Sequence, residues 1–455
     1  MPDSAGAVGG GRHRSLRRTA RSHAQVARSP LRIAVIGPFA IENYGDHVIR
    51  VVLERMLSEY LPLASADIFD AVEGRLGFGG EQAVFSIESL EERHVAQPYD
   101  AIVIAGGSVI HFEVLMQEVN GARSPYPLWK LWAESSRVAA KHGVKLIWNS
   151  PEVPIDFSGW EVFAARALIG SVDYLAVRDG DSVRALAQIG GERAFETPDS
   201  GWLVRRVFGD DAASVGMPGD LIELALHQNV AVFHCNQRLP RSDFEQVTRV
   251  LESIQGRGYR VVLVPLAYAN GEQRLLRELN DSSGDAFLIS EDHLSLAQMV
   301  GLFARCDLYV GLSLHGAITT VAYGGEVVAF DYERRRKTRN LYTSLGKARH
   351  YTTNLDDLER VIAGLGGPTR RKQVSRRVGA AAAQVDESFA RMAALLATPD
   401  DKEPRLIDVY YQLALTETQA RFGLQQQLRD LSEGYRDCYE QYLSLRRAVL
   451  GDDAD

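Results

Sequence analysis

A histidine stands where a predicted strand meets a predicted helix. In GLSLHGAITTVAYGG, residues 311–325, a glycine and a serine end an apolar run, and His315 opens a segment of small residues. The positive end of a helix disfavours an imidazolium and lowers the pKa of the ring, whereas an anionic ligand acts in the opposite sense. A ring held between these effects can exchange protons near neutral pH. His315 is therefore a candidate general acid, with a structural histidine as the alternative.

An arginine ends another predicted strand. Arg178 closes the apolar run of YLAVRDGDSVRAL, residues 174–186, directly before a predicted helix. A guanidinium binds a carboxylate or a phosphate through two parallel hydrogen bonds, so Arg178 is a candidate for holding an anionic substrate. The alternative is a structural ion pair with Asp179 or Asp181.

A glycine pair ends a third predicted strand. In AGGSVIHFE, residues 105–113, Gly106 and Gly107 come before Ser108, which offers a hydroxyl and a backbone N–H. Such a loop can hold a phosphate or a carboxylate. A simple turn between strand and helix is the alternative.

The first predicted strand ends in a loop that also suits an anion. In GPFAIENYGDHVIR, residues 37–50, Gly45 allows a close approach of the backbone, and Asp46 is predicted to cap a helix that begins near His47. The spacing fits neither GxGxxG nor Walker A, so neither dinucleotide nor P-loop binding is supported. A capped helix with a tight turn is the alternative.

A basic run follows the last predicted strand. The segment DYERRRKTRN, residues 331–340, holds Arg334, Arg335, Arg336, Lys337 and Arg339. A solvated basic face is one interpretation, and a phosphate-binding cluster at a strand end is the other.

These positions all lie within an alternation of short apolar runs and longer helical patterns. Apolar runs with little internal alternation, such as IVIA, are typical of parallel strands that are covered on both faces. The predicted strands span residues 32–37, 99–107, 144–151, 172–179, 229–236, 259–267, 307–312 and 325–332. The predicted helices among them span residues 47–60, 127–143, 180–190, 241–258 and 295–306.

A loop-like stretch near residues 205–222 divides this alternation in two. We expect an α/β fold with two Rossmann-like domains, residues 31–205 and 225–365, that face a central cleft. Ligands of such folds bind at the carboxyl ends of the strands. The strand ends described above are therefore expected to meet at the cleft.

The first 30 residues form a basic tail. They carry six arginines against one acid, while the whole chain has a net charge of −8. The apolar segment of a signal peptide is missing, so we expect residues 1–30 to be disordered, with attraction to anionic lipid headgroups as the alternative.

The end of the chain, residues 370–455, is predicted to be a helical extension. A seam with alternating spacings of 4 and 3 suits helix pairing. The seam consists of Leu424, Leu428, Leu431, Tyr435, Cys438, Tyr442 and Leu445. Three roles stay open: covering an apolar face of the same chain, self-association of copies, and contact with a membrane surface.

The composition of the 455 residues argues against several classes of protein. The acidic net charge gives no reason to expect nucleic acid as a partner. No run of 18 apolar residues predicts a transmembrane helix. The three cysteines, Cys235, Cys306 and Cys438, form no zinc or disulfide pattern, which fits a reducing compartment.

Taken in order along the chain, these motifs resemble the polysaccharide pyruvyl transferase family. The matching segments are NYGDHVI (43–49), AGGSVI (105–110), VRDGDSVRAL (177–186), TPDSGWLV (197–204), SLHGAITTVAYGG (313–325) and FDYERRRK (330–337). The resemblance covers about residues 32–345 and leaves out the basic tail and the C-terminal helices.

The resemblance implies a two-lobed fold similar to that of GT-B glycosyltransferases. It also implies transfer of a pyruvate or carboxyvinyl unit from phosphoenolpyruvate to sugar hydroxyls, which yields a ketal on a cell-surface glycan or its lipid-linked precursor. The family's motif arginine falls on Arg178 and its motif histidine on His315. Many relatives have a basic residue just before that histidine, where this chain has Leu314, and the basic run is a candidate substitute.

We therefore expect Arg178 to hold the carboxylate or phosphate, and His315 to act as the general acid or to protonate the leaving phosphate. Neither a metal nor a cofactor is expected beside the donor substrate, phosphoenolpyruvate. The expected substrate contacts are Asn43, Gly45, Asp46, Gly106, Gly107, Ser108, Ser313, Gly316, Arg336 and Lys337.

The expected partners are a sugar or glycolipid acceptor, further copies bound through the C-terminal helices, and a membrane surface contacted peripherally. The expected location is the cytoplasm or the inner face of the membrane. Two other functions stay open: a GT-B glycosyltransferase that uses a nucleotide sugar, and a non-catalytic scaffold that binds glycans.

Overall fold

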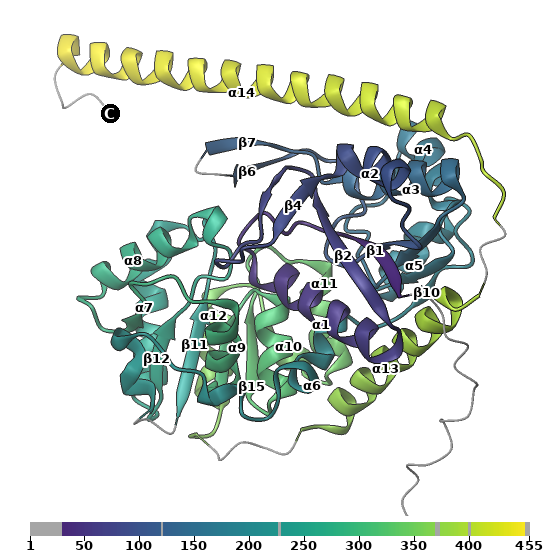
Figure 1. Ribbon diagram of the computed structural model, residues 1–455. Helices are drawn as coiled ribbons and strands as arrows, with labels where there is room; N and C mark the ends of the chain where they lie inside the picture. The colour runs from purple at the N-terminus through teal and green to yellow at the C-terminus, as the bar shows by residue number, and fades with distance from the viewer. Residues whose placement is uncertain (1–29, 120–121, 226–228, 369–373, 399–401, 451–455) are drawn as a thin grey trace, which may run out of the picture.

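The computed structural model describes residues 30–119, 122–225, 229–368, 374–398 and 402–450. Almost all of the predicted basic tail therefore lies outside the described residues. Two α/β lobes, each built on a largely parallel sheet, and a helical C-terminal extension make up the fold, as expected (Figure 1).

The first lobe is built on an eight-stranded sheet of order β10-β9-β8-β5-β1-β2-β4-β3. Every strand pair is parallel except β3–β4, and the central strands are buried on both faces, as their continuous apolar runs predict. Its strands are β1 (Leu31–Ile36), β2 (Leu63–Asp70), β3 (Gly74–Arg75), β4 (Ala83–Ser86), β5 (Ala101–Ile104), β8 (Lys145–Trp148), β9 (Tyr174–Val177) and β10 (Phe195–Glu196).

Helices cover both faces of this sheet. They are α1 (Tyr44–Tyr60), α2 (Leu90–Ala96), α3 (Trp129–His142), α4 (Trp160–Ile169), α5 (Gly180–Ala187) and α6 (Val204–Phe208). An antiparallel hairpin of β6 (Leu115–Val119) and β7 (Ala122–Tyr126) projects from the lobe. A 3₁₀ segment, Ser200–Leu203, leads from β10 into α6.

The second lobe repeats the plan with a six-stranded parallel sheet of order β13-β12-β11-β14-β15-β16. Its strands are β11 (Val230–His234), β12 (Arg260–Leu263), β13 (Leu288–Ile289), β14 (Leu308–Gly311), β15 (Glu326–Phe330) and β16 (Tyr351–Thr352). Its helices are α7 (Phe244–Gln255), α8 (Glu272–Ser282), α9 (Leu296–Arg305), α10 (Leu314–Ala322), α11 (Arg336–Ser344) and α12 (Leu355–Gly364).

In both sheets, the order in which strands are added reverses at the first strand. The chain builds outward from β1 through β2, then returns to add β5 on the other side, and β11 takes the same place in the second sheet. Ligands of such sheets bind beside this change of direction, outside the carboxyl ends of the strands. The order of strands therefore places the loops after β1, β5, β11 and β14 around one site.

The two lobes pack directly on each other through α1. The Tyr44 hydroxyl lies 2.8 Å from Thr319 Oγ1, and the Tyr44 backbone N–H donates to Leu266 O at 2.8 Å. The Tyr44 ring also packs against Phe303, with 5.2 Å between ring centroids. One buried hydrophobic cluster accordingly runs through both lobes.

The extension consists of α13 (Arg376–Leu396) and α14 (Asp408–Leu450). The predicted helical pattern of residues 404–449 is one helix, which runs along the first lobe and beyond it (Figure 1). None of the helices among the described residues is long and apolar enough to span a membrane.

Candidate active site

Both sheets direct the carboxyl ends of their strands at one cavity of about 310 Å³ between the lobes. Eight residues expected in the site line it: Asn43, Asp46, Gly107, Ser108, Arg178, Ser313, His315 and Lys337. The structure therefore brings together the strand ends from both halves of the sequence.

Arg178 follows β9 and is buried in the cavity wall. Its Nη1 donates to Asp199 Oδ2 at 3.2 Å, and its Nη2 donates to Glu152. The alternative prediction, that Arg178 forms an ion pair, is therefore confirmed, but the predicted partners Asp179 and Asp181 are wrong. Asp179 caps α5 instead, and Asp181 pairs with a neighbouring arginine on the surface.

Glu152 is the carboxylate that holds both Arg178 and Lys337 in place. Its Oε2 also accepts the Ser108 hydroxyl at 2.5 Å and lies 3.8 Å from Lys337 Nζ. Burial alone would raise the pKa of Glu152, but the charges of Arg178 and Lys337 outweigh it and lower the pKa to about 2. The carboxylate is thus ionised at any physiological pH.

Asp199 joins the two lobes. Its Oδ2 accepts from Arg178 of the first lobe and lies 3.2 Å from His315 Nε2 of the second, while Oδ1 accepts the Gly201 N–H at 2.8 Å. Burial opposes ionisation here, but His315 and Arg178 outweigh it and hold the pKa of Asp199 well below its usual range. One buried carboxylate thus orients both residues expected to be catalytic.

His315 stands in the first turn of α10, after Ser313, whose side chain caps the helix by accepting from Gly316 N at 3.3 Å. Gly45 of the first lobe lies directly against the ring. A Cβ built on Gly45 would overlap His315 Nδ1 and lie 2.7 Å from both Cγ and Cε1. Gly45 therefore allows close approach, although the approaching group is the histidine of the other lobe.

Asp46 is not the cap that the sequence predicts. Helix α1 begins at Tyr44, and Asn43 caps it by accepting from Gly45 N at 3.1 Å. Asp46 lies inside the first turn, at the cavity. Burial raises the pKa of Asp46 to about 6, although His315, Lys337 and Arg178 act to lower it.

The basic run divides between two roles. Lys337 lines the cavity, and its nearest carboxylate partner among the described residues is Glu152, at 3.8 Å. Arg336 points elsewhere: its Nη2 donates to Pro154 O at 2.6 Å and ties α11 to the first lobe. Arg335 also lines the cavity and pairs with Glu333 at 2.6 Å.

Three expected contacts besides Arg336 do not line the cavity. Gly45 supports His315, Gly106 adopts a φ of 135° against Ile49, and Gly316 packs on the Tyr309 ring, which an added Cβ would approach to 2.9 Å. These three glycines give room to neighbouring side chains.

Four acidic or histidine residues of the site, Glu152, Asp199, His234 and Glu272, were not predicted from the sequence. Glu152 and His234 stand at the ends of predicted strands, and Asp199 lies inside the quoted motif TPDSGWLV, so position was a signal for these three. Glu272 begins α8, a helix that was not predicted. Among the described residues, no group of three or more His, Cys, Asp or Glu side chains is placed to hold a metal ion.

Comparison with protein families identifies the family of this chain. The family described as polysaccharide pyruvyl transferase matches residues 43–334, which is more than half of the chain and includes Arg178 and His315 but ends just before Arg335 and Lys337. No curated protein matches the sequence.

Solved structures match the fold at low identity. The UDP-GlcNAc 2-epimerase from Methanocaldococcus jannaschii gives a TM-score of 0.51 at 10% identity and covers 80% of this chain and 98% of its own. That from Rickettsia bellii gives 0.50 at 11%, covering 81% and 97%, and an S. aureus MnaA–UDP co-structure gives 0.50 at 8%, covering 82% and 99%. At such identities the likeness establishes the GT-B-like fold, as expected, and no activity.

Proposed function

The chain belongs to the polysaccharide pyruvyl transferase family, and from this we propose that it transfers a pyruvate or carboxyvinyl unit from phosphoenolpyruvate to sugar hydroxyls. The proposed setting is the synthesis of a cell-surface glycan in the cytoplasm or at the inner face of the membrane, with no cofactor beside the donor. The observation that carries this proposal is Asp199, which holds Arg178 and His315 from opposite lobes at one cavity.

Phosphoenolpyruvate needs positive charge because it carries a carboxylate and a phosphate. The cavity wall supplies Arg178, Lys337 and Arg335 next to His315. Lys337 is the most available of the three cations, since its nearest carboxylate oxygen lies 3.8 Å away. The charge of Arg178 is already shared between Glu152 and Asp199, so we propose that Lys337 makes the first contact with the donor.

The proposed reaction adds a proton to C3 of phosphoenolpyruvate and breaks the C2–O bond to its phosphate. His315 gives a proton to C3 of the enol ether, and a sugar hydroxyl attacks C2 as positive charge develops there. The C2–O bond to phosphate then breaks, with its electron pair leaving on phosphate. A second hydroxyl bonds to C2 and closes the ketal, so that one donor and one diol give one ketal and one phosphate.

The test is a transfer assay with phosphoenolpyruvate and a panel of pyrophosphate-linked sugars, read as ketal product by mass spectrometry and as released phosphate. His315→Ala should lower kcat by roughly 10²–10⁴. The matched control is His142→Ala, which removes a histidine of α3 that pairs with Glu91 of α2. This variant should leave turnover unchanged. Product from the wild-type chain with unaltered turnover in His315→Ala would remove this histidine from the reaction.

Melting shifts separate the proposal from its rivals. Phosphoenolpyruvate should raise the melting temperature of the wild-type chain, because a ligand that binds only the folded state stabilises it. A shift with UDP-sugars and none with phosphoenolpyruvate would instead support a glycosyltransferase. No shift with any anionic ligand would support a non-catalytic scaffold.

A further inference from the structure

A carboxylate in the second lobe lines the same cavity and has no part in the donor chemistry proposed above. Glu272 begins α8 and is 4% exposed. Its Oε2 accepts the backbone N–H groups of Leu266 and Ala267, both at 2.8 Å, and lies 3.1 Å from His234 Nε2. Three donors therefore fix one oxygen of this carboxylate.

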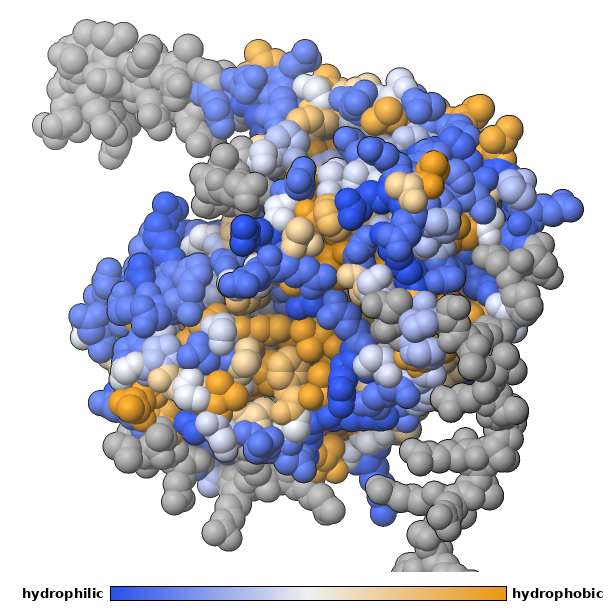
Figure 2. Space-filling view, viewed as in Figure 1, coloured by the Kyte–Doolittle hydropathy of each residue, from blue (hydrophilic) through white to orange (hydrophobic). Residues whose placement is uncertain are grey.

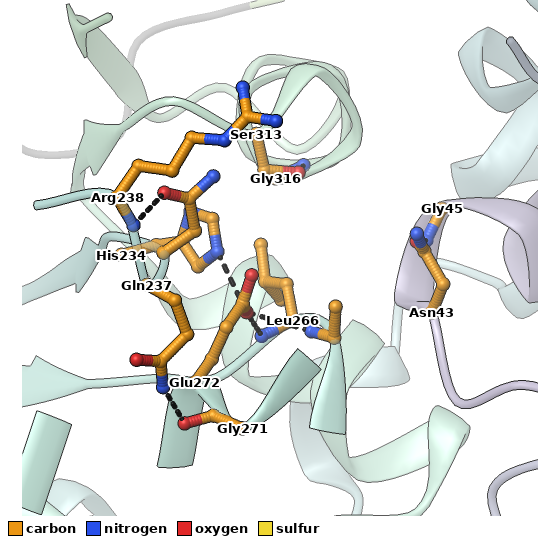
Figure 3. Close-up of polar contacts among 12 residues, drawn as sticks. Asn43, Gly45, His234, Gln237, Arg238, Leu266, Gly271, Glu272, Ser313 and Gly316 are labelled. Carbon is orange, nitrogen blue, oxygen red and sulfur yellow. Dashed lines mark hydrogen bonds and ion pairs between the residues drawn. The ribbon is translucent and has the colours of Figure 1, made fainter. Parts of the chain in front are cut away.

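The other oxygen takes none of these bonds. All three donors bind Oε2 rather than Oε1 of Glu272, and Glu272 lines the cavity. Figure 3 shows Glu272 joined to His234 and Leu266 by dashed lines, with Asn43 and Gly45 of the first lobe facing them across the site. The bonds to Oε2 thus hold Oε1 in one orientation at the cavity.

His234 has the geometry of a positioning residue. It ends β11, is 3% exposed, and directs Nε2 at Glu272 while Nδ1 is buried without a partner among the described residues. Since Nδ1 is closed to solvent, the ring acts through Glu272. The pair resembles the general pattern in which a second group orients a catalytic one.

Acceptor groups lie beside Glu272 in the cavity wall. Asn270 lines the cavity from the same lobe, and so does Asn236, whose amide is already bonded to Glu333 and Tyr332. An amide oxygen and a carboxylate accept hydrogen bonds from hydroxyls, and a carboxylate repels a second anion. Glu272 and Asn270 therefore suit the hydroxyls of a neutral polyol better than an anionic donor.

We propose that Glu272 is the catalytic base that accepts the proton of the attacking sugar hydroxyl, with His234 as its positioning residue. This inference rests on the proposed function and names the acceptor class as a neutral sugar with two adjacent free hydroxyls. The hydroxyl oxygen bonds to C2 as its proton passes to Glu272 Oε1, while His315 supplies the proton that C3 gains. The second hydroxyl gives its proton to His315, which is neutral after this transfer. The proton on Glu272 passes through solvent to the departing phosphate, so both side chains return to their starting states.

The test separates donor binding from transfer. Glu272→Gln keeps the shape of the side chain but cannot take a proton, so kcat should fall by roughly 10²–10⁴ while the melting shift with phosphoenolpyruvate stays as in the wild type. Glu278→Gln, on the exposed face of the same helix, is the matched control and should keep full turnover.

His234→Gln should lower kcat less than Glu272→Gln does, leave KM for phosphoenolpyruvate unchanged, and move the acid limb of the pH–rate profile. If His234 served stability alone, its replacement would not move the acid limb of the pH–rate profile. Where Glu272→Gln does not fold, Glu272→Asp withdraws the oxygen by one methylene and supplies the same comparison of turnover with donor binding.

The outcomes distinguish this inference from the proposed function. A wild-type chain that makes no product from phosphoenolpyruvate with any diol overturns both. A wild-type chain that makes product, together with full turnover in Glu272→Gln, overturns the role of Glu272 alone. Loss of the phosphoenolpyruvate shift in a folded Glu272→Gln protein also overturns it, because Glu272 would then serve the donor.

Discussion

At the scale of single residues, Gly45 of the first lobe packs directly against His315 of the second. Gly45 lies in the first turn of α1, where alanine would ordinarily be the better residue by about 0.5–1 kcal/mol. Here an added Cβ would overlap the imidazole. At this position the gain in helix propensity from alanine is therefore smaller than the cost of its overlap with the imidazole.

Gly45→Ala should displace His315 from Asp199. We expect kcat to fall at least about tenfold and the free energy of unfolding to fall by about 1–3 kcal/mol, the usual cost of overpacking. Gly423→Ala in α14, where a Cβ meets nothing within 4 Å, is the matched control and should stabilise the protein slightly. Wild-type turnover in Gly45→Ala would contradict the packing of glycine on this ring.

Asp46 gives a prediction about pH. Because burial raises the pKa of this carboxyl to about 6, the folded protein holds a proton there at pH values where the unfolded chain has lost it. The contribution of Asp46 to the free energy of unfolding therefore decreases as pH rises from about 4 to about 7. A shift of about two units corresponds to roughly 3 kcal/mol.

Asp46→Asn removes this effect. The free energy of unfolding of the variant, minus that of the wild type, should increase by up to about 3 kcal/mol between pH 4 and pH 7. Urea denaturation across this range measures the difference. A difference that does not change with pH would contradict the raised pKa.

At the scale of elements, the start of α1 shows how a local cap fixes the site. Asn43 sits in extended backbone, with φ −119° and ψ 116°, and its side chain accepts from Gly45 N. Asn43→Ala should lower the free energy of unfolding by about 1 kcal/mol, whereas Asn43→Asp should retain most of it. Equal losses in the two variants would show that Asn43 contributes through something other than the cap.

The sequence predicts strands where apolar runs are continuous, as in β5 (AIVI) and β14 (LYVG), because such runs are buried on both faces. It does not predict the two-residue strands β3, β10, β13 and β16, which are too short to show a period. The start of α1 was predicted wrongly because Asn43 and Asp46 are both good caps, and only the fold selects between them.

The same limit applies to the site. Arg178 and His315 were predicted because each stands where an apolar run gives way to a helical pattern. Their partners were not, since Arg178 meets Glu152 across 26 positions of the sequence and His315 meets Asp199 across 116. Such pairs depend on the order of strands and on the packing of the two lobes, which a local pattern does not contain.

At the scale of the whole molecule, α14 is the longest of the helices that lie beyond the residues matched by the family. Its first turns pack on the first lobe, where Ile407, Tyr411 and Ala414 are buried. Farther along, Leu424, Leu428 and Leu431 are 59%, 58% and 71% exposed, and Figure 2 shows orange residues among the blue ones along the coloured part of this helix. The alternative in which the seam covers its own chain is therefore wrong for these three leucines.

The later seam positions, Tyr435, Cys438, Tyr442 and Leu445, have side chains that lie outside the described residues, so the rest of the seam stays a prediction. Spacings of 4 and 3 match the seam of paired helices more closely than the 3.6-residue period of a helix on a flat surface. This periodicity favours a second copy of the chain over a membrane surface.

We expect the wild-type chain to show a mass that rises with concentration in light scattering, because pairing of α14 would bury the exposed leucines. Replacing Leu424, Leu428 and Leu431 together by serine should leave a single-copy mass with turnover unchanged, since none of them lines the cavity. Ile222→Ser, which alters another exposed apolar residue (63%), is the matched control. A different result would assign the seam to a membrane surface. In that case the wild-type chain would stay at single-copy mass and float with anionic vesicles, and the triple serine replacement would abolish the flotation.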